Sequence, residues 1–180
     1  ASLLLDAMGS QRLKAEDGDI LVVAQKIVSK SEGRLIRLSE VTPSAEAEAL
    51  AAEVDKDPRL VELILRESSS ILRKAPGILL VRNRLGIIGA NAGIDQSNID
   101  HREGESALLL PVDPDRSATL LRKTLQQRTA KKLGVIVSDS MNRPWRLGTL
   151  GQAIGSAGVT VLDDRRGDQD LFGRELKVTV

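Results

Sequence analysis

The sequence has no cysteine, one histidine and almost no aromatic residues among its 180 positions. The absence of cysteine excludes disulfides, thiolate metal sites and cysteine nucleophiles. A single histidine excludes a metal site built from several histidines of one chain. Trp145 and Phe172 are the only aromatic residues. Surfaces that stack on nucleic-acid bases need several aromatic side chains, so nucleic acid is not an expected partner.

Charge and hydropathy exclude further classes. Lys and Arg total 26 against 25 Asp and Glu, and the net charge of +1 argues against nucleic-acid binding driven by overall charge. No apolar run approaches the roughly 20 residues of a membrane helix, so no membrane partner is expected. The chain does not open with a charged segment and a small-residue cleavage site. We therefore predict no signal peptide and expect a cytoplasmic protein.

The hydrophobic pattern predicts one α+β domain over residues 1–180. Hairpins interrupt a strict strand–helix alternation, which favours mixed and antiparallel sheets with flanking helices over a doubly wound sheet. The continuous apolar run at 20–24 is typical of a strand buried on both faces. We expect helices at 2–8, from Thr42 to about Val54, after Asp57-Pro58 and after Asp113-Pro114. We expect further strands at 78–81, 85–90, 108–111, 133–138, 159–162 and 174–180.

The strongest chemical signal follows the predicted strand at 133–138. Asp139 and Ser140 come where that strand should end, and their oxygens suit Mg²⁺ or Mn²⁺. Arg143 and Arg146 offer guanidinium donors to a phosphate or a carboxylate. The alternative is an aspartate that caps its own turn, beside two solvated arginines.

A second signal is the loop at 89–98, which is rich in glycine and asparagine. Asp95 offers a metal ligand and Asn98 an amide donor and acceptor. If the fold brings Asp95 close to Asp139, the two carboxylates form a cation site. An ordinary loop built on Asn and Asp turns is the alternative.

A third signal is the polar segment at 25–30. Lys26 and Lys30 are able to neutralise phosphates, and Ser29 is able to donate a hydrogen bond. The segment is not a Walker A loop, because it lacks the glycines that precede the lysine of that motif. The single histidine, His101, is expected to be solvated rather than catalytic. Trp145 is expected to pack beside Pro144 rather than to bind substrate.

Four segments together resemble a known family. Their order and spacing are similar to those of the coenzyme F-420:L-glutamate ligases across nearly the whole chain. The segments are 19–34 (DILVVAQKIVSKSEGR), 91–98 (NAGIDQSN), 138–146 (SDSMNRPWR) and 170–176 (DLFGREL).

This resemblance implies a GTP-dependent ligase. Such an enzyme adds L-glutamate to the lactyl carboxylate of a deazaflavin coenzyme precursor through an acyl phosphate, and then adds γ-linked glutamates. The resemblance also implies Mg²⁺ or Mn²⁺, stimulation by K⁺ and a homodimer, but it assigns no catalytic residue. It implies metal binding by Asp95, Asp139 and Ser140, and GTP binding by Gln25, Lys26, Lys30 and Asn98.

The family pattern extends beyond both ends of these 180 residues. It has a loop before the position of Ala1 and a glycine-rich segment after Val180, and both contribute to nucleotide binding. We therefore expect an incomplete ligase domain. The alternative is a non-catalytic domain of the same fold that binds a nucleotide or a partner.

Overall fold

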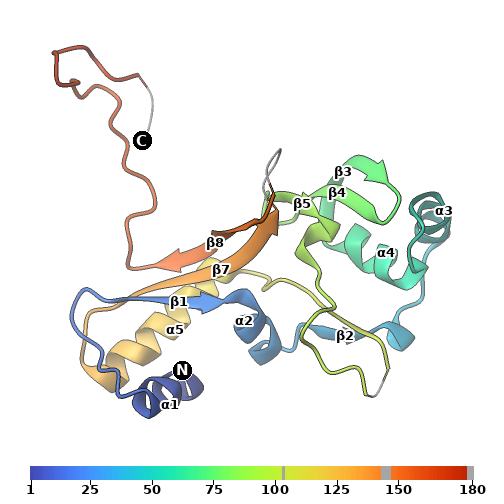
Figure 1. The fold of residues 1–180 in the computed structure, drawn as a ribbon, viewed down its shortest axis with the longest axis horizontal. Coiled ribbons are helices and arrows are strands. Elements are labelled where there is room, and N and C mark those ends of the chain that lie inside the picture. The colour runs from blue at the N-terminus through green and yellow to red at the C-terminus, as the bar shows by residue number, and fades with distance from the viewer. Residues whose placement is uncertain (103, 143–146, 178–180) are drawn as a thin grey trace.

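The computed structural model describes residues 1–102, 104–142 and 147–177 and has an α+β fold, as predicted (Figure 1). Its helices, with two 3₁₀ turns, are α1 (Ser2–Ser10), α2 (Gln25–Ser31), η1 (Leu38–Glu40), α3 (Ala45–Val54), α4 (Pro58–Arg66), η2 (Asn91–Gly93) and α5 (Pro114–Thr129). Its strands are β1 (Ile20–Ala24), β2 (Leu35–Arg37), β3 (Ser68–Ala75), β4 (Ile78–Asn83), β5 (Ile88–Ala90), β6 (Ser106–Leu108), β7 (Gly134–Asn142) and β8 (Thr149–Ala157). They form three small sheets, ordered β1-β7-β8, β2-β6 and β3-β4-β5.

The first sheet has helices against one face. β1 runs parallel to β7, which pairs antiparallel with β8, and α5 and α1 lie beneath them in Figure 1. Val23 and Val137 are buried against Leu125 of α5. The opposite face of β1 is open, since Ile20 and Val22 are 54% and 61% exposed. The prediction that this strand is buried on both faces was wrong, because the described helices cover only one of them.

The β3-β4-β5 sheet packs on α3 and α4. Asp57 caps α4 through the N–H of Arg59, and Pro58 begins that helix, as the sequence predicted. Ser44 rather than Thr42 caps α3, because the Ser44 hydroxyl is the group that accepts the N–H of Ala47. The core of this unit joins both helices to β4 and contains Ala47, Leu50, Ala51, Val54, Val61, Ile64, Leu79, Val81 and Ala92.

The short β2-β6 sheet lies between these two units in Figure 1. An ion pair strengthens the connection, since the Arg34 guanidinium lies 2.9 Å from the Glu67 carboxylate. Arg34 also donates to the carbonyl of Leu110. Strands β2 and β3 were not predicted, because β2 has only three residues and β3 is mostly polar, so neither shows a clear hydrophobic pattern.

The predictions for the C-terminal third need correction. The glycine-rich stretch at 148–158 is largely β8, and residues 159–162 form no strand. Small residues serve β8 because it passes close to α5: a Cβ on Gly155 would lie 2.3 Å from the carbonyl carbon of Pro114. Residues 174–177 also form no strand, and 178–180 lie outside the described residues. The described part of this segment extends away from the sheets (Figure 1). No helix in the described ranges has the length and apolar character required to traverse a bilayer.

Candidate active site

Two of the predicted site residues lie where β1 ends. Ala24 is the last residue of β1 and pairs with Ser138, so Gln25 and Asp139 come directly after that pair. Gln25 begins α2 and is buried. The sequence predicted that the strand would end at Asp139. This was wrong, because β7 continues to Asn142 through its pairing with β8. The side chain at 139 nevertheless lies just beyond the end of β1.

Asp95 reaches the same place from another part of the chain. Its N–H donates to the Leu108 carbonyl at 3.1 Å, and its carbonyl accepts from the Leu108 N–H at 2.8 Å. These two hydrogen bonds attach the loop to the end of β6 and fix the direction of the Asp95 side chain. The short helix η2 before it contains three residues in succession with positive φ, Asn91, Ala92 and Gly93. This sharp turn directs the chain from β5 toward β6.

Both lysines of α2 contact this loop. The Lys26 ammonium lies 2.6 Å from Oδ2 of Asp95, and it donates to the hydroxyl of Ser97 at 2.8 Å and to the Ser97 carbonyl at 3.2 Å. The Lys30 ammonium donates to the carbonyl of Asn98 at 2.9 Å. The structure therefore brings α2 and the Asp95 loop together. Sequence reasoning missed Ser97, because no motif spacing marked it as a partner of Lys26.

Asp139 has a raised pKa. Burial is the main cause, and the nearby Asp95 carboxylate adds to it by repulsion. The N–H of Ser140, which donates to Asp139 at 2.8 Å, and the Gln25 amide oppose the rise by stabilising the charged form. Gln25 is held in turn by the hydroxyl of Ser29, which donates to Oε1 at 2.9 Å. The Lys26 ammonium also lowers the pKa of this half-buried carboxylate, but burial has the larger effect and the net shift is upward.

Asp95 has the opposite shift. Burial alone would raise its pKa, but the Lys26 ammonium and the N–H of Ser97 together lower it. The Ser97 N–H donates to Oδ1 of Asp95 at 2.6 Å. Two neighbouring carboxylates therefore have pKa values that are pushed apart, an arrangement that is common at functional sites. The Lys26 ammonium marks a position beside Asp95 where the surroundings favour a positive charge.

The donor set fits a divalent cation that is bound together with phosphate. Within the described ranges, no group of three or more His, Cys, Asp or Glu side chains gathers in a geometry that could hold a metal. Asp95 and Asp139 supply two carboxylates, and the exposed Ser140 supplies a hydroxyl. Mg²⁺ is commonly held by one or two carboxylates, with waters and substrate phosphates completing its shell. Arg143, Trp145 and Arg146 lie outside the described residues.

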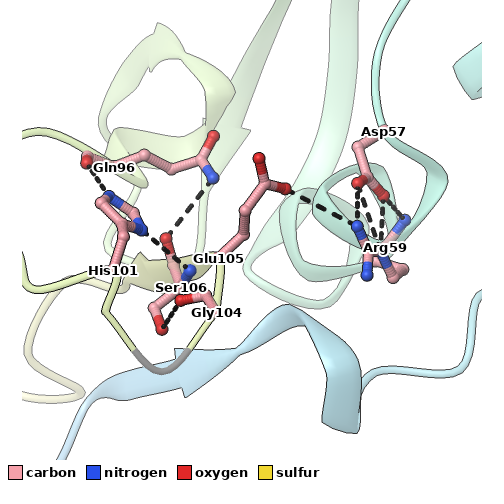
Figure 2. Close-up of polar contacts among 7 residues, drawn as sticks. All are labelled: Asp57, Arg59, Gln96, His101, Gly104, Glu105 and Ser106. Carbon is pink, nitrogen blue, oxygen red and sulfur yellow. Dashed lines mark hydrogen bonds and ion pairs between the residues drawn. The ribbon is translucent and has the colours of Figure 1, made fainter.

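The loop that carries Asp95 is closed at its far end by His101 (Figure 2). The ring Nδ1 accepts from the N–H of Ser106 at 3.2 Å, which leaves Nε2 to donate to the carbonyl of Gln96 at 2.8 Å. Glu105 also reaches Arg59 of α4, with 3.6 Å between the carboxylate and the guanidinium. His101 is exposed, as expected, but both ring nitrogens bind the main chain. Its role in the structure is to shape the loop.

Replacing Gly93 with Ala should destabilise the protein and disturb the site. Its φ is +77°, and an added Cβ would lie 2.7 Å from a buried methyl group of Leu110. We expect a loss of about 1–3 kcal/mol in the free energy of unfolding. Urea denaturation measures it, with Gly86→Ala as the matched control: φ is +82° there, but no atom lies within 4 Å of the added Cβ. Equal losses in the two variants would show that the Leu110 contact has no effect.

Fold and site together define an α+β protein with paired carboxylates beside two lysines, a set of groups suited to a cation and an anionic ligand. The chain belongs to the F420-0:Gamma-glutamyl ligase family, whose sequence profile matches residues 1–180. The family resemblance seen in the sequence is thereby confirmed.

Three relatives, each named "Coenzyme F420:L-glutamate ligase", are similar over most of the chain. The protein from Methanopyrus kandleri is 48% identical, over 95% of this chain and 67% of its own length. Those from Methanothermobacter thermautotrophicus and Archaeoglobus fulgidus are each 46% identical, over 99% and 95% of this chain and over 70% and 67% of their own lengths. The chain thus spans about two thirds of the length of these relatives.

Proposed function

We propose that this protein joins L-glutamate to the lactyl carboxylate of a deazaflavin coenzyme precursor, with GTP as the energy source, and then adds γ-linked glutamates. Family membership and the names of the relatives support a ligase of this kind. The observation that carries the proposal is the meeting of Asp95, Asp139 and Lys26, which come from separate parts of the chain. Phosphoryl transfer needs positioned cations and groups that donate hydrogen bonds to phosphate, and these residues could supply both needs.

Amide formation from a carboxylate requires an activated acyl group. In the proposed reaction, a carboxylate oxygen of the precursor attacks the γ-phosphorus of GTP, which gives an acyl phosphate and GDP. The amine of glutamate then attacks the acyl carbon, phosphate leaves, and the amine loses a proton. These two steps form one amide bond for each GTP consumed.

The residues divide these tasks. Asp95, Asp139 and Ser140 would hold Mg²⁺ or Mn²⁺, which when bound neutralises negative charge on phosphate oxygens. Lys26 and Lys30 would hold the phosphates of GTP by charge-assisted hydrogen bonds. Gln25 keeps Asp139 oriented through its buried amide. Asn98 would lie beside the phosphates held by Lys30, because the Lys30 ammonium donates to its carbonyl.

Product analysis tests this function. The protein at its full natural length is incubated with the precursor, glutamate and Mg²⁺ or Mn²⁺, with GTP in one arm and ATP in another. Mass spectrometry should find glutamylated product with GTP, and precursor labelled with ¹⁸O in its carboxylate should pass one labelled oxygen to phosphate. Replacing Na⁺ with K⁺ tests the proposed stimulation. GTP binding without any product would contradict the ligase and indicate a nucleotide-binding domain.

The same proposal includes a homodimer. The uncovered face of β1, with Ile20 and Val22 exposed, offers apolar surface for a second copy of the chain. Light scattering should give twice the monomer mass, and Val22→Glu should reduce it to the monomer. An unchanged mass in this variant would exclude that face as the interface.

A further inference from the structure

A cleft adjoins the carboxylate site. It lies between the β4-β5 hairpin and the β7-β8 hairpin and has a volume of about 470 Å³. Asp139 and Ser140 form part of its lining, so it is continuous with the proposed metal site. Its walls are largely aliphatic and include Ile78, Leu80, Ile88, Met141 and Ile154.

The lining has little charge. Asp139 is the one ionisable residue among the lining residues that the structure describes, so these residues supply no cation for a phosphate or a second carboxylate. The amide oxygen of Asn83 is already occupied, because it accepts from the N–H groups of Leu85 and Ile87 at 3.0 Å each. Ile78 and Ile88 are each 49% exposed, so their apolar side chains are available to a ligand.

We propose that this cleft binds the uncharged, flat ring portion of the carboxylate-bearing acceptor and leaves its carboxylate end beside Asp139. The inference rests on the proposed ligase function, which requires the acceptor carboxylate to reach the site of phosphoryl transfer. A volume of about 470 Å³ is in the usual range for small-molecule sites, and apolar walls with few polar groups suit a ring system.

The other two substrates fit this cleft poorly. L-Glutamate carries two carboxylates and an ammonium group, and a triphosphate needs cations to balance its charge. The two lysines of the carboxylate site, Lys26 and Lys30, belong to α2 and are not among the described residues that line the cleft. A guanine base needs hydrogen-bonding partners along its edge, whereas most of the described walls are aliphatic.

Gly89 allows a specific test, because a side chain at this position would fill the cleft. An added Cβ would lie 3.0 Å from Cε of Met141, and the backbone there is not in the left-handed region. For Gly89→Leu we expect at least a tenfold rise in the KM for the precursor, with the GTP-induced shift in melting temperature unchanged. Gly9→Leu in α1 is the matched control, because it also lacks a positive φ and has open space around its Cβ.

A binding measurement separates this inference from the proposed function. 5-Deazariboflavin carries the ring without the carboxylate, and its fluorescence reports binding to the wild-type protein and to each variant. Binding that weakens at least tenfold in Gly89→Leu and not in Gly9→Leu supports the cleft, even if no glutamylated product is ever found. Equal binding to both variants, or no binding to the wild type, overturns the inference and leaves the ligase function open to its own test.

Two further outcomes also decide the matter. If Gly89→Leu weakens GTP binding and leaves deazaflavin binding unchanged, the cleft holds the guanine base and the inference is wrong. If Gly89→Leu does not fold, Ile78→Trp takes its place, because Ile78 lines the cleft and is 49% exposed. The same tenfold loss of deazaflavin affinity is then expected, and unchanged affinity contradicts the inference.

Discussion

Asp139→Asn should abolish Mg²⁺-dependent GTP binding and at the same time stabilise the metal-free protein. The metal-dependent loss follows from removing one of the two carboxylates that would hold the cation. The gain follows because Asp139 is half-buried and repelled by Asp95, so its charge costs free energy when no cation is present. Solvent screens a half-exposed group, so we expect a gain of order 1 kcal/mol or less, or at most about 2–4 °C in melting temperature.

The same group gives a pH dependence of known sign. The pKa of Asp139 is raised in the folded protein, so the folded state binds more protons than the unfolded state between the unfolded and folded pKa values. This group alone therefore makes the metal-free protein more stable as the pH falls through that window. The stability difference between Asp139→Asn and the wild type should shrink as the pH is lowered from 7 to 4. Calorimetry at each pH measures this difference.

Asp95→Asn is the matched control, and its effect on the metal-free protein should have the opposite sign. The pKa of Asp95 is lowered, because the Lys26 ammonium and the Ser97 N–H stabilise its charge against the effect of burial. Its contribution is therefore present above the unfolded pKa and lost as the pH falls through the folded pKa. Both variants should lose the thermal shift produced by GTP with Mg²⁺. A metal-free Asp139→Asn protein that melts below the wild type would contradict the account of Asp139.

The sequence predicted the starts of two helices, because these depend on neighbouring residues. Asp57-Pro58 and Asp113-Pro114 each place a capping carboxylate before a proline, and both begin a helix in the structure. The strands at the C-terminal end were misplaced, since β8 depends on pairing with β7 and on the close approach of Gly155 to α5. Contacts of that kind join distant parts of the chain, and hydrophobic alternation does not reveal them.

The candidate site, like the fold, could be predicted from the sequence only in part. The sequence singled out Asp95 and Asp139 as separate candidates and gave their pairing only as a condition. In the structure the Asp95 carboxylate lies near enough to Asp139 to raise its pKa by repulsion. The ion pair of Lys26 with Asp95 could not be predicted, since 69 positions separate these residues and only the folded chain brings them to 2.6 Å. The bridging role of His101 was missed for the same reason: its partners are main-chain groups, which leave no pattern in the sequence.

Lys26→Met should weaken GTP binding and strengthen metal binding in the absence of nucleotide. In the structure the Lys26 ammonium pairs with Asp95, at the place that we propose for the metal ion. A phosphate would compete with Asp95 for this ammonium, while a metal ion would compete with the ammonium for Asp95. Without Lys26, GTP loses a charge-assisted contact, and we expect roughly a tenfold to hundredfold loss in affinity. Mn²⁺ alone should bind more tightly, because Asp95 no longer has a competing partner.

Lys30→Met separates the two effects. Within the described part of the chain, Lys30 donates to the main-chain carbonyl of Asn98 and pairs with neither Asp95 nor Asp139. Its loss should therefore weaken GTP binding without changing the affinity for Mn²⁺. Calorimetric titration of each variant with GTP and with Mn²⁺ measures both affinities. If Lys26→Met and Lys30→Met change Mn²⁺ affinity equally, the Lys26–Asp95 pair does not control the metal position. If Mn²⁺ binds more tightly in Lys26→Met alone, then Lys26 holds the site closed to metal until a nucleotide draws its ammonium away from Asp95.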